Sequence, residues 1–102
     1  MTVTFADGTH YAIPAEMMRV HSPSAEVQGH SPEQRQLVYG KGNVAILEIV
    51  PTGNYAIRIV FDDMHDTGIY SWTLLRELGS RLDTWLADYE AELAQKGLSR
   101  DR

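Results

Sequence analysis

Hydrophobic and polar positions alternate at the start of the chain in the manner of a β-hairpin. "VTF" alternates before the turn "ADGT", and "HYAI" follows the turn, so the pattern predicts strands at Thr2–Phe5 and His10–Ile13. Pro14 then precedes "AEMMRV", and proline is favoured at the first position of a helix. The chain is therefore expected to begin with a strand–strand–helix unit.

The middle of the chain is expected to hold a long loop followed by a meander of strands. The segment from His21 to Gln34 contains two Ser-Pro pairs, which favour an irregular surface loop. A short strand is expected near Gln36–Tyr39, and Val44–Val50 is apolar at nearly every position, which is typical of a central strand covered on both faces. The next strand is expected to divide its side chains between two faces, with Tyr55, Ile57, Ile59 and Phe61 on one and Arg58 and Asp62 on the other.

The last third of the chain is expected to contain a strand and two helices. After the turn "DDMH", Thr67–Tyr70 forms a strand, Ser71 caps the helix "WTLLREL", and Gly79 ends it. Ser80 with Asp83 has the spacing of a capping box for a second helix, "RLDTWLADYEAELAQ". This helix carries an apolar stripe formed by Leu82, Trp85, Leu86, Tyr89 and Leu93.

A weak repeat relates the beginning of the chain to its second half. Residues of the first unit recur 56 or 57 positions later, and one inserted residue in the second hairpin accounts for the difference; the matches are Phe5, Asp7 and Arg19 with Phe61, Asp63 and Arg76. Chance similarity between two common patterns is the alternative. The predicted fold is α+β, with two ββα-like units around a mostly antiparallel sheet and a C-terminal helix packed on it. One domain is expected over residues 1–95, followed by a frayed tail at 96–102.

Composition and charge narrow the classes of function. The 102 residues are 43% hydrophobic, and the formal net charge of −5, with nine scattered lysines and arginines, argues against a nucleic-acid binder. The longest apolar run, "VAILEIV", is interrupted by Glu48 and is too short to span a bilayer. Because the N-terminus lacks a basic region followed by an apolar run, the cytoplasm is the expected location. The absence of cysteine excludes disulfides, thiolate metal ligands and cysteine nucleophiles.

Asp62, Asp63, His65 and Asp66 form the densest group of chemically active residues. Carboxylates beside an imidazole can bind a metal ion or raise the pKa of the histidine for acid–base work. The alternative, which we favour, is a tight hairpin turn whose aspartates accept hydrogen bonds from turn amides and whose histidine is solvated. Catalysis would further require a cleft that holds a substrate.

Two other groups of residues have both a structural and a functional interpretation. His21 with Ser22 and Ser24 has the residue types of a serine hydrolase, but the serines flank a proline and the chain lacks the G-x-S-x-G motif, so a turn that ends the first helix is favoured. The aromatic residues of the last third are expected to fill the core rather than form a binding platform. Trp72 directly follows the helix cap and is expected to be partly exposed at a partner surface.

Three segments of the chain resemble a known family. "RVHSPSAEVQGH", "GNVAILEIVPTGNYAIRIVFDDMHDTGIYSW" and "LLRELG" are similar to the gamma-butyrobetaine hydroxylase-like N-terminal domain, a small domain of unknown function, and the likeness runs from about Val3 to Tyr89. By this resemblance, such a domain precedes the catalytic jelly roll of carnitine-pathway hydroxylases and there holds a structural zinc through cysteines and one histidine. The resemblance also covers domains appended to Mrp-type iron–sulfur carriers and free-standing bacterial proteins. The jelly roll that holds iron and 2-oxoglutarate has no counterpart in this chain.

The resemblance implies one zinc ligand here and the loss of others. His65 stands where the family's zinc histidine stands, whereas Ser22 and Ser24 lie in the region of the thiolates, and neutral hydroxyls are poor zinc ligands. His21 and a carboxylate of the hairpin turn are candidate replacements, because imidazole and carboxylate bind divalent metals. No cofactor is expected, and zinc or another divalent metal held by His65 and His21 is the alternative.

We expect the chain to be a non-catalytic accessory or protein-interaction module. By the resemblance, its partner is an iron–sulfur carrier or another metalloenzyme, and neither nucleic acid nor a membrane is expected. The expected binding surface joins the loop after the first helix to the second hairpin turn and includes His21, Ser22, Ser24, Asp63, His65, Asp66 and Trp72. A metal-binding domain is the alternative, and an independent enzyme would require a deep pocket with converging polar groups.

Overall fold

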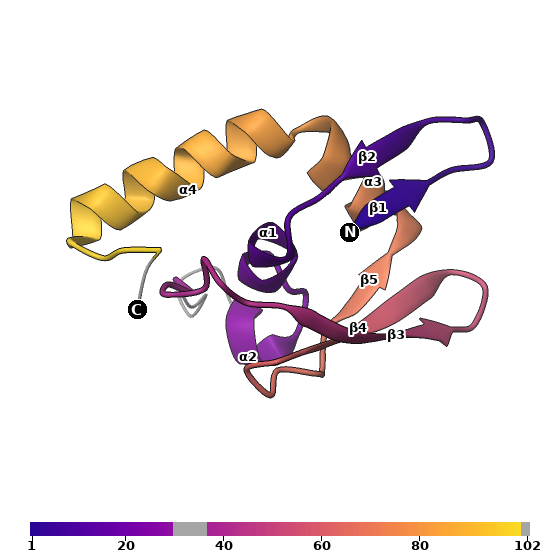
Figure 1. The fold of residues 1–102 in the computed structure, drawn as a ribbon, viewed down its shortest axis with the longest axis horizontal. Coiled ribbons are helices and arrows are strands. Elements are labelled where there is room, and N and C mark those ends of the chain that lie inside the picture. The colour runs from indigo at the N-terminus through magenta and orange to yellow at the C-terminus, as the bar shows by residue number, and fades with distance from the viewer. Residues whose placement is uncertain (30–36, 101–102) are drawn as a thin grey trace.

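Groups of strands are followed by pairs of helices in the computed structural model, which describes residues 1–29 and 37–100. The elements follow in the order β1 (Thr2–Thr4), β2 (His10–Ala12), α1 (Ala15–Val20), α2 (Ala25–Gln28), β3 (Ile46–Thr52), β4 (Ala56–Phe61), β5 (Ile69–Ser71), α3 (Trp72–Ser80) and α4 (Leu82–Lys96) (Figure 1). One antiparallel sheet contains β1 and β2, and the other contains β3, β4 and β5 with β4 in the middle. The fold is therefore mixed α+β, as predicted, with its strands divided between two small sheets. Within the described ranges, no helix has the length and apolar character that crossing a membrane requires.

The first hairpin forms as predicted, and a short helix follows it. Strands β1 and β2 pair with Val3 opposite Tyr11. Pro14 is the residue before α1 rather than its first residue, and α2 occupies part of the segment predicted to be a loop. Residues 37–45 contain no strand, so the strand expected near Gln36–Tyr39 is absent from the part of that range that the structure describes. Gln36 itself lies outside the described residues.

Strand β3 lies at the edge of its sheet, and the prediction that this apolar run is a central strand is wrong. It pairs with β4, which in turn pairs with β5. Its register shifts between Ile46 and Glu48, and Leu47 and Ile49 are 66% and 43% exposed. An apolar run indicates that burial of its side chains is favourable, but it does not indicate which strand the neighbouring helices cover. In this fold, β4 is the covered strand, and Ile57, Ile59 and Phe61, which were predicted to share one face, are buried on it. Tyr55 was predicted on the same face, but it precedes the strand and is 64% exposed.

The two hairpin turns have the same hydrogen-bond pattern. Three hydrogen bonds of the first turn recur in the second turn at an offset of 56 residues. The bonds from Phe5 N to Thr9 O (2.8 Å) and from Gly8 N to Phe5 O (3.0 Å) correspond to those from Phe61 N to His65 O (3.0 Å) and from Met64 N to Phe61 O (3.3 Å). The bond from Thr9 N to Asp7 Oδ1 (3.0 Å) corresponds to that from His65 N to Asp63 Oδ1 (3.2 Å). Gly8 and Met64 occupy the same place and both have positive φ, 88° and 74°. The sequence repeat is therefore a structural repeat.

The two units exchange their ion pairs. Asp7 in the first turn contacts Arg76 of α3 at 3.3 Å, whereas Asp63 in the second turn contacts Arg19 of α1 at 2.8 Å. Each hairpin thus bonds to the helix of the other unit. Four of the six matching residues identified from the sequence, the two aspartates and the two arginines, form these reciprocal contacts.

Two glycines show the same exchange in the packing. A Cβ atom at Gly68 would lie 2.5 Å from Ser22 Oγ, and one at Gly79 would overlap the Tyr11 ring. Positions 11 and 22 recur as 68 and 79, so the two contacts are equivalent in the repeat. Gly79 does not end α3, as the sequence analysis predicted; the helix continues to Ser80, and the glycine allows the close approach of the first hairpin.

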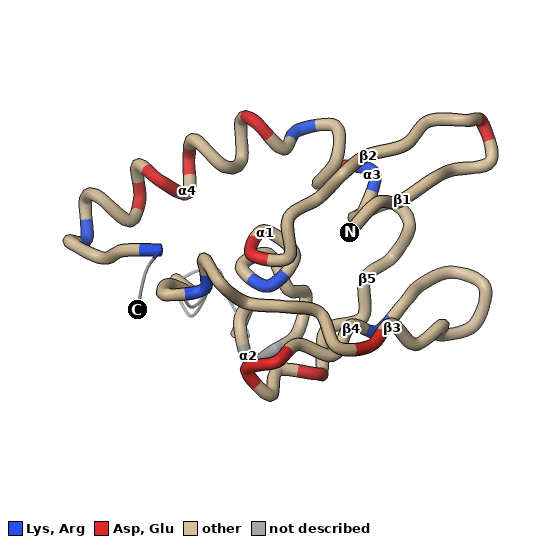
Figure 2. Tube along the Cα trace, viewed as in Figure 1, with Lys and Arg blue, Asp and Glu red and all other residues tan. Residues whose placement is uncertain are grey.

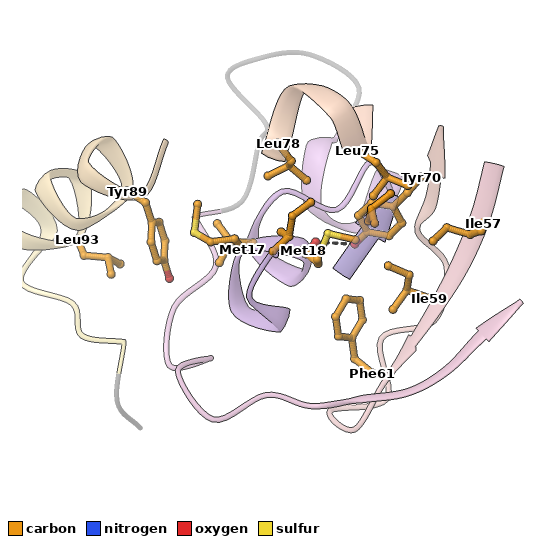
Figure 3. Packing of buried hydrophobic residues seen from close by; sticks show 13 residues of the cluster. Met17, Met18, Ile57, Ile59, Phe61, Tyr70, Leu75, Leu78, Tyr89 and Leu93 are labelled. Atoms are coloured by element: carbon orange, nitrogen blue, oxygen red, sulfur yellow. Dashed lines mark hydrogen bonds between the residues drawn. The ribbon is translucent and has the colours of Figure 1, made fainter. Parts of the chain in front are cut away.

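The shared core lies around α1. Met17 and Met18 are fully buried, and Figure 3 shows them between side chains of the β4–β5 strands, of α3 and of α4. The Tyr70 hydroxyl donates to the carbonyl of Met18, and burial raises the pKa of Tyr70 to about 12. Tyr89 and Leu93 attach α4 to this core. Both units therefore contribute to a single hydrophobic interior.

The ends of α3 and α4 agree only in part with the sequence prediction. Ser71 caps α3 as predicted, because its Oγ accepts from Leu74 N at 3.1 Å. The predicted capping box of Ser80 and Asp83 is wrong: Arg81 precedes α4 without a side-chain cap, and Ser80 Oγ donates to the carbonyl of Glu77.

The segment after α4 is tied to the body of the protein as far as Arg100, which differs from the frayed tail predicted from residue 96. Ser99 and Arg100 accept backbone hydrogen bonds from Gly40 and Gly42, both at 2.9 Å. The Arg100 guanidinium also contacts the buried carboxylate of Glu16 at 2.6 Å. Residues 101–102 lie outside the described part of the chain.

Candidate functional site

The turn between β4 and β5 contains the acidic cluster singled out in the sequence. Asp62 joins the turn to the chain before β3, because it donates to Ala45 O at 2.9 Å and its Oδ1 accepts from Ala45 N at 3.1 Å. Asp66 is exposed, and its carboxylate lies 4.0 Å from Arg58 Nη1. Of the aspartates in this cluster, Asp63 accepts a hydrogen bond from a turn amide, that of His65, as the favoured interpretation predicts. The histidine differs from that interpretation, since it is buried.

His65 and Ser22 form the centre of the candidate site. The imidazole Nε2 lies 2.8 Å from Ser22 Oγ, and both residues are buried, at 5% and 0% exposure. Ser24 donates through its backbone N to Ser22 Oγ at 3.3 Å, and its own hydroxyl lies 2.6 Å from Thr67 Oγ1. We call the Ser22–His65 and Ser24–Thr67 contacts the latch, because they connect the loop after α1 to the second turn. The sequence analysis predicted that this loop and turn form one surface, and the structure joins them through buried contacts.

Asp63 is held by two cations. Its Oδ2 lies 2.8 Å from Arg19 Nε and 2.7 Å from Lys41 Nζ, while Oδ1 accepts from the backbone N of His65. Burial raises the pKa of Asp63, but the hydrogen bonds from Lys41, Arg19 and His65 outweigh burial and lower it to about 2. The carboxylate is therefore ionised at neutral pH and is engaged by cations rather than orienting the imidazole.

The latch has the residue types of a serine hydrolase without the geometry. A nucleophilic serine has to reach a substrate carbonyl, and Ser22 is fully buried beneath Gly68 and Tyr70. Ser22 pairs with His65 and not with His21, which was its partner in the sequence-based hydrolase hypothesis. The arrangement can hold two segments together, and this conformation leaves a substrate no access to Ser22.

The residues at the latch do not fit a closed zinc site. His65 bonds to Ser22, whereas the His21 ring packs against Trp85 with ring centroids 4.8 Å apart and the rings tilted by 43°. Across the described residues, no three His, Cys, Asp or Glu side chains are grouped so that they could hold a metal ion. The hydroxyls at Ser22 and Ser24 are poor zinc ligands. The hydrogen bonds of the latch occupy the place where the family resemblance puts a metal.

A cleft of about 530 Å³ lies beside the latch. Its lining residues come from α3, from α4, and from the loop after α1 through the end of α2, and they are His21, Pro23, Gln28, Leu74, Trp85, Asp88, Tyr89 and Glu92. The four residues from α4 stand at positions i, i+3, i+4 and i+7, which is one face of the helix. The described lining residues include two carboxylates and neither lysine nor arginine. Figure 2 shows acidic residues along α4.

The latch fixes one wall of this cleft. Ser22, held by His65, lies between the wall residues His21 and Pro23 in sequence. Gln28 donates through Nε2 to the Ser22 carbonyl at 2.8 Å, which attaches the end of α2 to the same point. On the opposite wall, the Tyr89 hydroxyl donates to Val38 O at 2.7 Å, and burial raises the pKa of Tyr89 to about 12. Hydrogen bonds thus fix both walls.

Trp72 does not belong to this region. It is 40% exposed, as the sequence predicts, but its indole N donates to the carbonyl of Asn54, and its ring lines a hollow with Phe5 and Arg76 at the first hairpin. The predicted surface therefore separates into the latch, the cleft beside it and a tryptophan that lines a separate hollow.

The sequence analysis missed several residues that build the site. Arg19 and Lys41 are distant in sequence from Asp63, and sequence spacing does not indicate ion pairs over 44 residues. Asp88 and Glu92 carried a signal, because acids on the same helical face as the apolar stripe interrupt a surface that would otherwise pack in the core. Trp85, which was predicted to fill the core, packs against the core while it is partly exposed at the cleft.

Comparison with known proteins assigns the chain to a family. A family model described as "Gamma-butyrobetaine hydroxylase-like, N-terminal" matches residues 1–76. The chain belongs to this family. The matched residues of this gamma-butyrobetaine hydroxylase-like domain contain the whole latch and exclude α4. The resemblance drawn from the sequence is therefore confirmed.

Solved structures extend the comparison to the rest of this family member. Two NMR solution structures are 50% and 44% identical to it, each with a TM-score of 0.82; the alignments cover 98% and 97% of this chain and 78% and 74% of the other. A crystal structure of a protein of unknown function from the DUF971 family of Acidithiobacillus ferrooxidans ATCC 23270 is 39% identical, with a TM-score of 0.64 and 78% of both chains covered. No curated protein matches the chain.

Proposed function

We propose that this chain is a cytoplasmic, non-catalytic accessory module that binds a protein partner in the cleft between α4 and the loop after α1. The observation that carries the proposal is the latch beside the cleft. The Ser22 hydroxyl and the His65 imidazole bond to each other in a buried contact. This contact holds the neighbours of Ser22, His21 and Pro23, in the cleft wall. The same residues that could have performed chemistry therefore serve to shape a surface.

The cleft has properties of a protein-binding site. Its volume of about 530 Å³ falls within the range of clefts that bind ligands. Trp85 stands in it, and tryptophan is enriched among the residues that dominate binding energy at interfaces. Because both walls are fixed by hydrogen bonds, a partner would lose little of its binding energy to ordering them.

The family relationship supports the class of partner. By the resemblance to domains appended to Mrp-type carriers, we propose an iron–sulfur carrier or another metalloenzyme as the partner. The alternative proposal, a metal-binding domain with His65 and His21 as ligands, has less support, because the described residues offer these two imidazoles separate contacts and no third ligand.

Affinity purification of the tagged protein from its own host tests the proposal. Trp85→Leu removes the indole from the cleft, and Trp72→Leu is the matched control, since it removes a partly exposed indole at the distant hollow. Pro23→Tyr is a second cleft variant that adds bulk at an exposed wall position. His65→Ala is unsuitable as a surface probe, because the side chain is 5% exposed and its loss would open the latch.

We expect a specific partner to be captured by wild type and by the Trp72→Leu variant, and to be lost from both cleft variants. Circular dichroism and melting curves establish that the variants are folded. Equal capture by the wild type and both folded cleft variants would refute the cleft as the partner site.

A further inference from the structure

We infer that the cleft receives a cationic side chain, the guanidinium of an arginine in a basic segment of the partner protein. The inference rests on the proposed function, since it takes the cation to be carried by a protein partner. It adds the chemistry of recognition, which follows from the charges and rings that line the cleft.

The electrostatic field in the cleft favours a cation. Asp88 lines it and is exposed, and among the described residues no lysine or arginine lines it. Helix α4 carries four acidic residues and one lysine, and the chain as a whole has a net charge of −5. Clefts lined by one sign of charge concentrate ions of the opposite sign. An acidic partner segment would be repelled from this site.

The aromatic residues favour a planar cation. The Trp85 indole stands next to the His21 ring, tilted at 43° with centroids 4.8 Å apart, which limits its rotation. Asp88 follows Trp85 by three positions on the same helical face, and both residues line the cleft. A guanidinium can stack on an aromatic face while it bonds to a carboxylate, and a lysine ammonium cannot do both with planar geometry.

The protein already contains this arrangement once. At the other hollow, the Arg76 guanidinium lies 4.2 Å from the centre of the Phe5 ring and pairs with Asp7 at 3.3 Å. There, ring, carboxylate and arginine come from the same chain. In the cleft, Trp85 supplies a ring and Asp88 supplies a carboxylate, and the arginine is the component that the described lining residues do not provide.

A titration with N-acetyl-arginine amide, followed by heteronuclear NMR, tests the inference. The chain has two tryptophans, so the two indole signals report on the cleft and on the distant hollow in one experiment. We expect the Trp85 indole signal to shift and the Trp72 signal to stay in place. N-acetyl-citrulline amide, which has nearly the same shape without the charge, is expected to cause little shift.

Two variants distinguish the effect of the cleft carboxylate on binding from the effect of the overall negative charge of α4. Asp88→Asn is expected to weaken binding about three-fold, as for the loss of one exposed ion pair. Asp83→Asn makes the same change of charge on the same helix outside the cleft and is expected to leave the affinity unchanged. Raising the ionic strength to about 1 M, where the screening length is about 3 Å, is expected to weaken binding of the arginine probe.

The inference falls if citrulline shifts Trp85 as strongly as arginine does, if Asp88→Asn and Asp83→Asn weaken binding equally, or if the arginine probe does not bind. If capture of the partner depends on Trp85 but not on Asp88 or on salt, the proposed function stands and recognition of a guanidinium is refuted. Arginine binding with partner capture unaffected by the cleft variants would support the site and refute the proposed function.

Discussion

Replacing Asp63 by asparagine is expected to destabilise the protein far more than the equivalent replacement of Asp7. The two residues are related by the repeat: each accepts a turn amide through Oδ1 and each pairs with an arginine of the opposite unit. They differ in burial, because the Asp63 side chain is 6% exposed and that of Asp7 is 56% exposed. Asp63 also contacts Lys41, so the comparison reports the combined effect of burial and of a second cation.

The magnitude follows from the pKa of Asp63. A pKa lowered from 3.8 to about 2 corresponds to about 2 kcal/mol of folding free energy at neutral pH. Because the pKa in the folded protein is below that of the unfolded chain, this stability is present above pH 3.8 and is lost as the pH falls towards 2. A loss of about 2 kcal/mol would lower the melting temperature by about 10 °C. The exposed pair at Asp7 is expected to contribute little, as surface ion pairs do.

Urea unfolding at neutral pH and at several values between pH 4 and pH 2 measures this difference. We expect Asp63→Asn to lower the free energy of unfolding at neutral pH and the gap to wild type to close with acid. Asparagine can still accept from the His65 amide, so the measured change reports the charge. Equal losses for Asp63→Asn and Asp7→Asn, or a gap that does not change between pH 4 and pH 2, would refute the reasoning.

Three further predictions follow from other features of the fold. Met64→Gly is expected to raise the free energy of unfolding by about 0.5–1 kcal/mol in urea titrations. Met64 has φ 74° at the place that Gly8 fills in the first turn, and its side chain is 86% exposed, so little packing is lost. A lower free energy of unfolding would show that the backbone at Met64 is not strained. Arg100→Gln is expected to cost about 2 kcal/mol, because it leaves the carboxylate of Glu16 buried without that guanidinium, and an unchanged melting curve would contradict this. Elemental analysis of the purified protein is expected to find far less than one equivalent of metal, with no effect of a chelator on melting; one equivalent of zinc would instead support the metal-binding alternative.

Local features of the fold could be predicted from the sequence, because the forces that produce them act over a few residues. The two hairpins, the Ser71 cap and the repeat all depend on turn residues and on alternation within short segments. The role of Gly79 could not be found in this way. A glycine near the end of a helical pattern indicates a stop, whereas its contact with Tyr11 arises only when the first hairpin packs on α3.

The candidate site was predictable by region but not by role. Ser22, Ser24 and His65 of the latch could be predicted, since serines near a proline and a histidine among aspartates are unusual enough to single out, whereas Thr67 was not predicted. Their burial depends on the crossing of the two units, which no local pattern contains. The same crossing brings Arg19 to Asp63, and it makes β4 rather than β3 the covered strand. Charged residues on a helical face were the one signal of the cleft that could have been used.

The exchange of ion pairs between the units has a consequence for synthesis on the ribosome. Asp7 cannot form its ion pair until Arg76, 69 residues further along, has been synthesised, and Tyr11 cannot pack until Gly79 has been synthesised. The nascent N-terminal half therefore lacks a native surface to close against until most of the polypeptide has emerged. Contacts between residues so far apart slow folding, so we expect the chain to acquire its structure late and in one step.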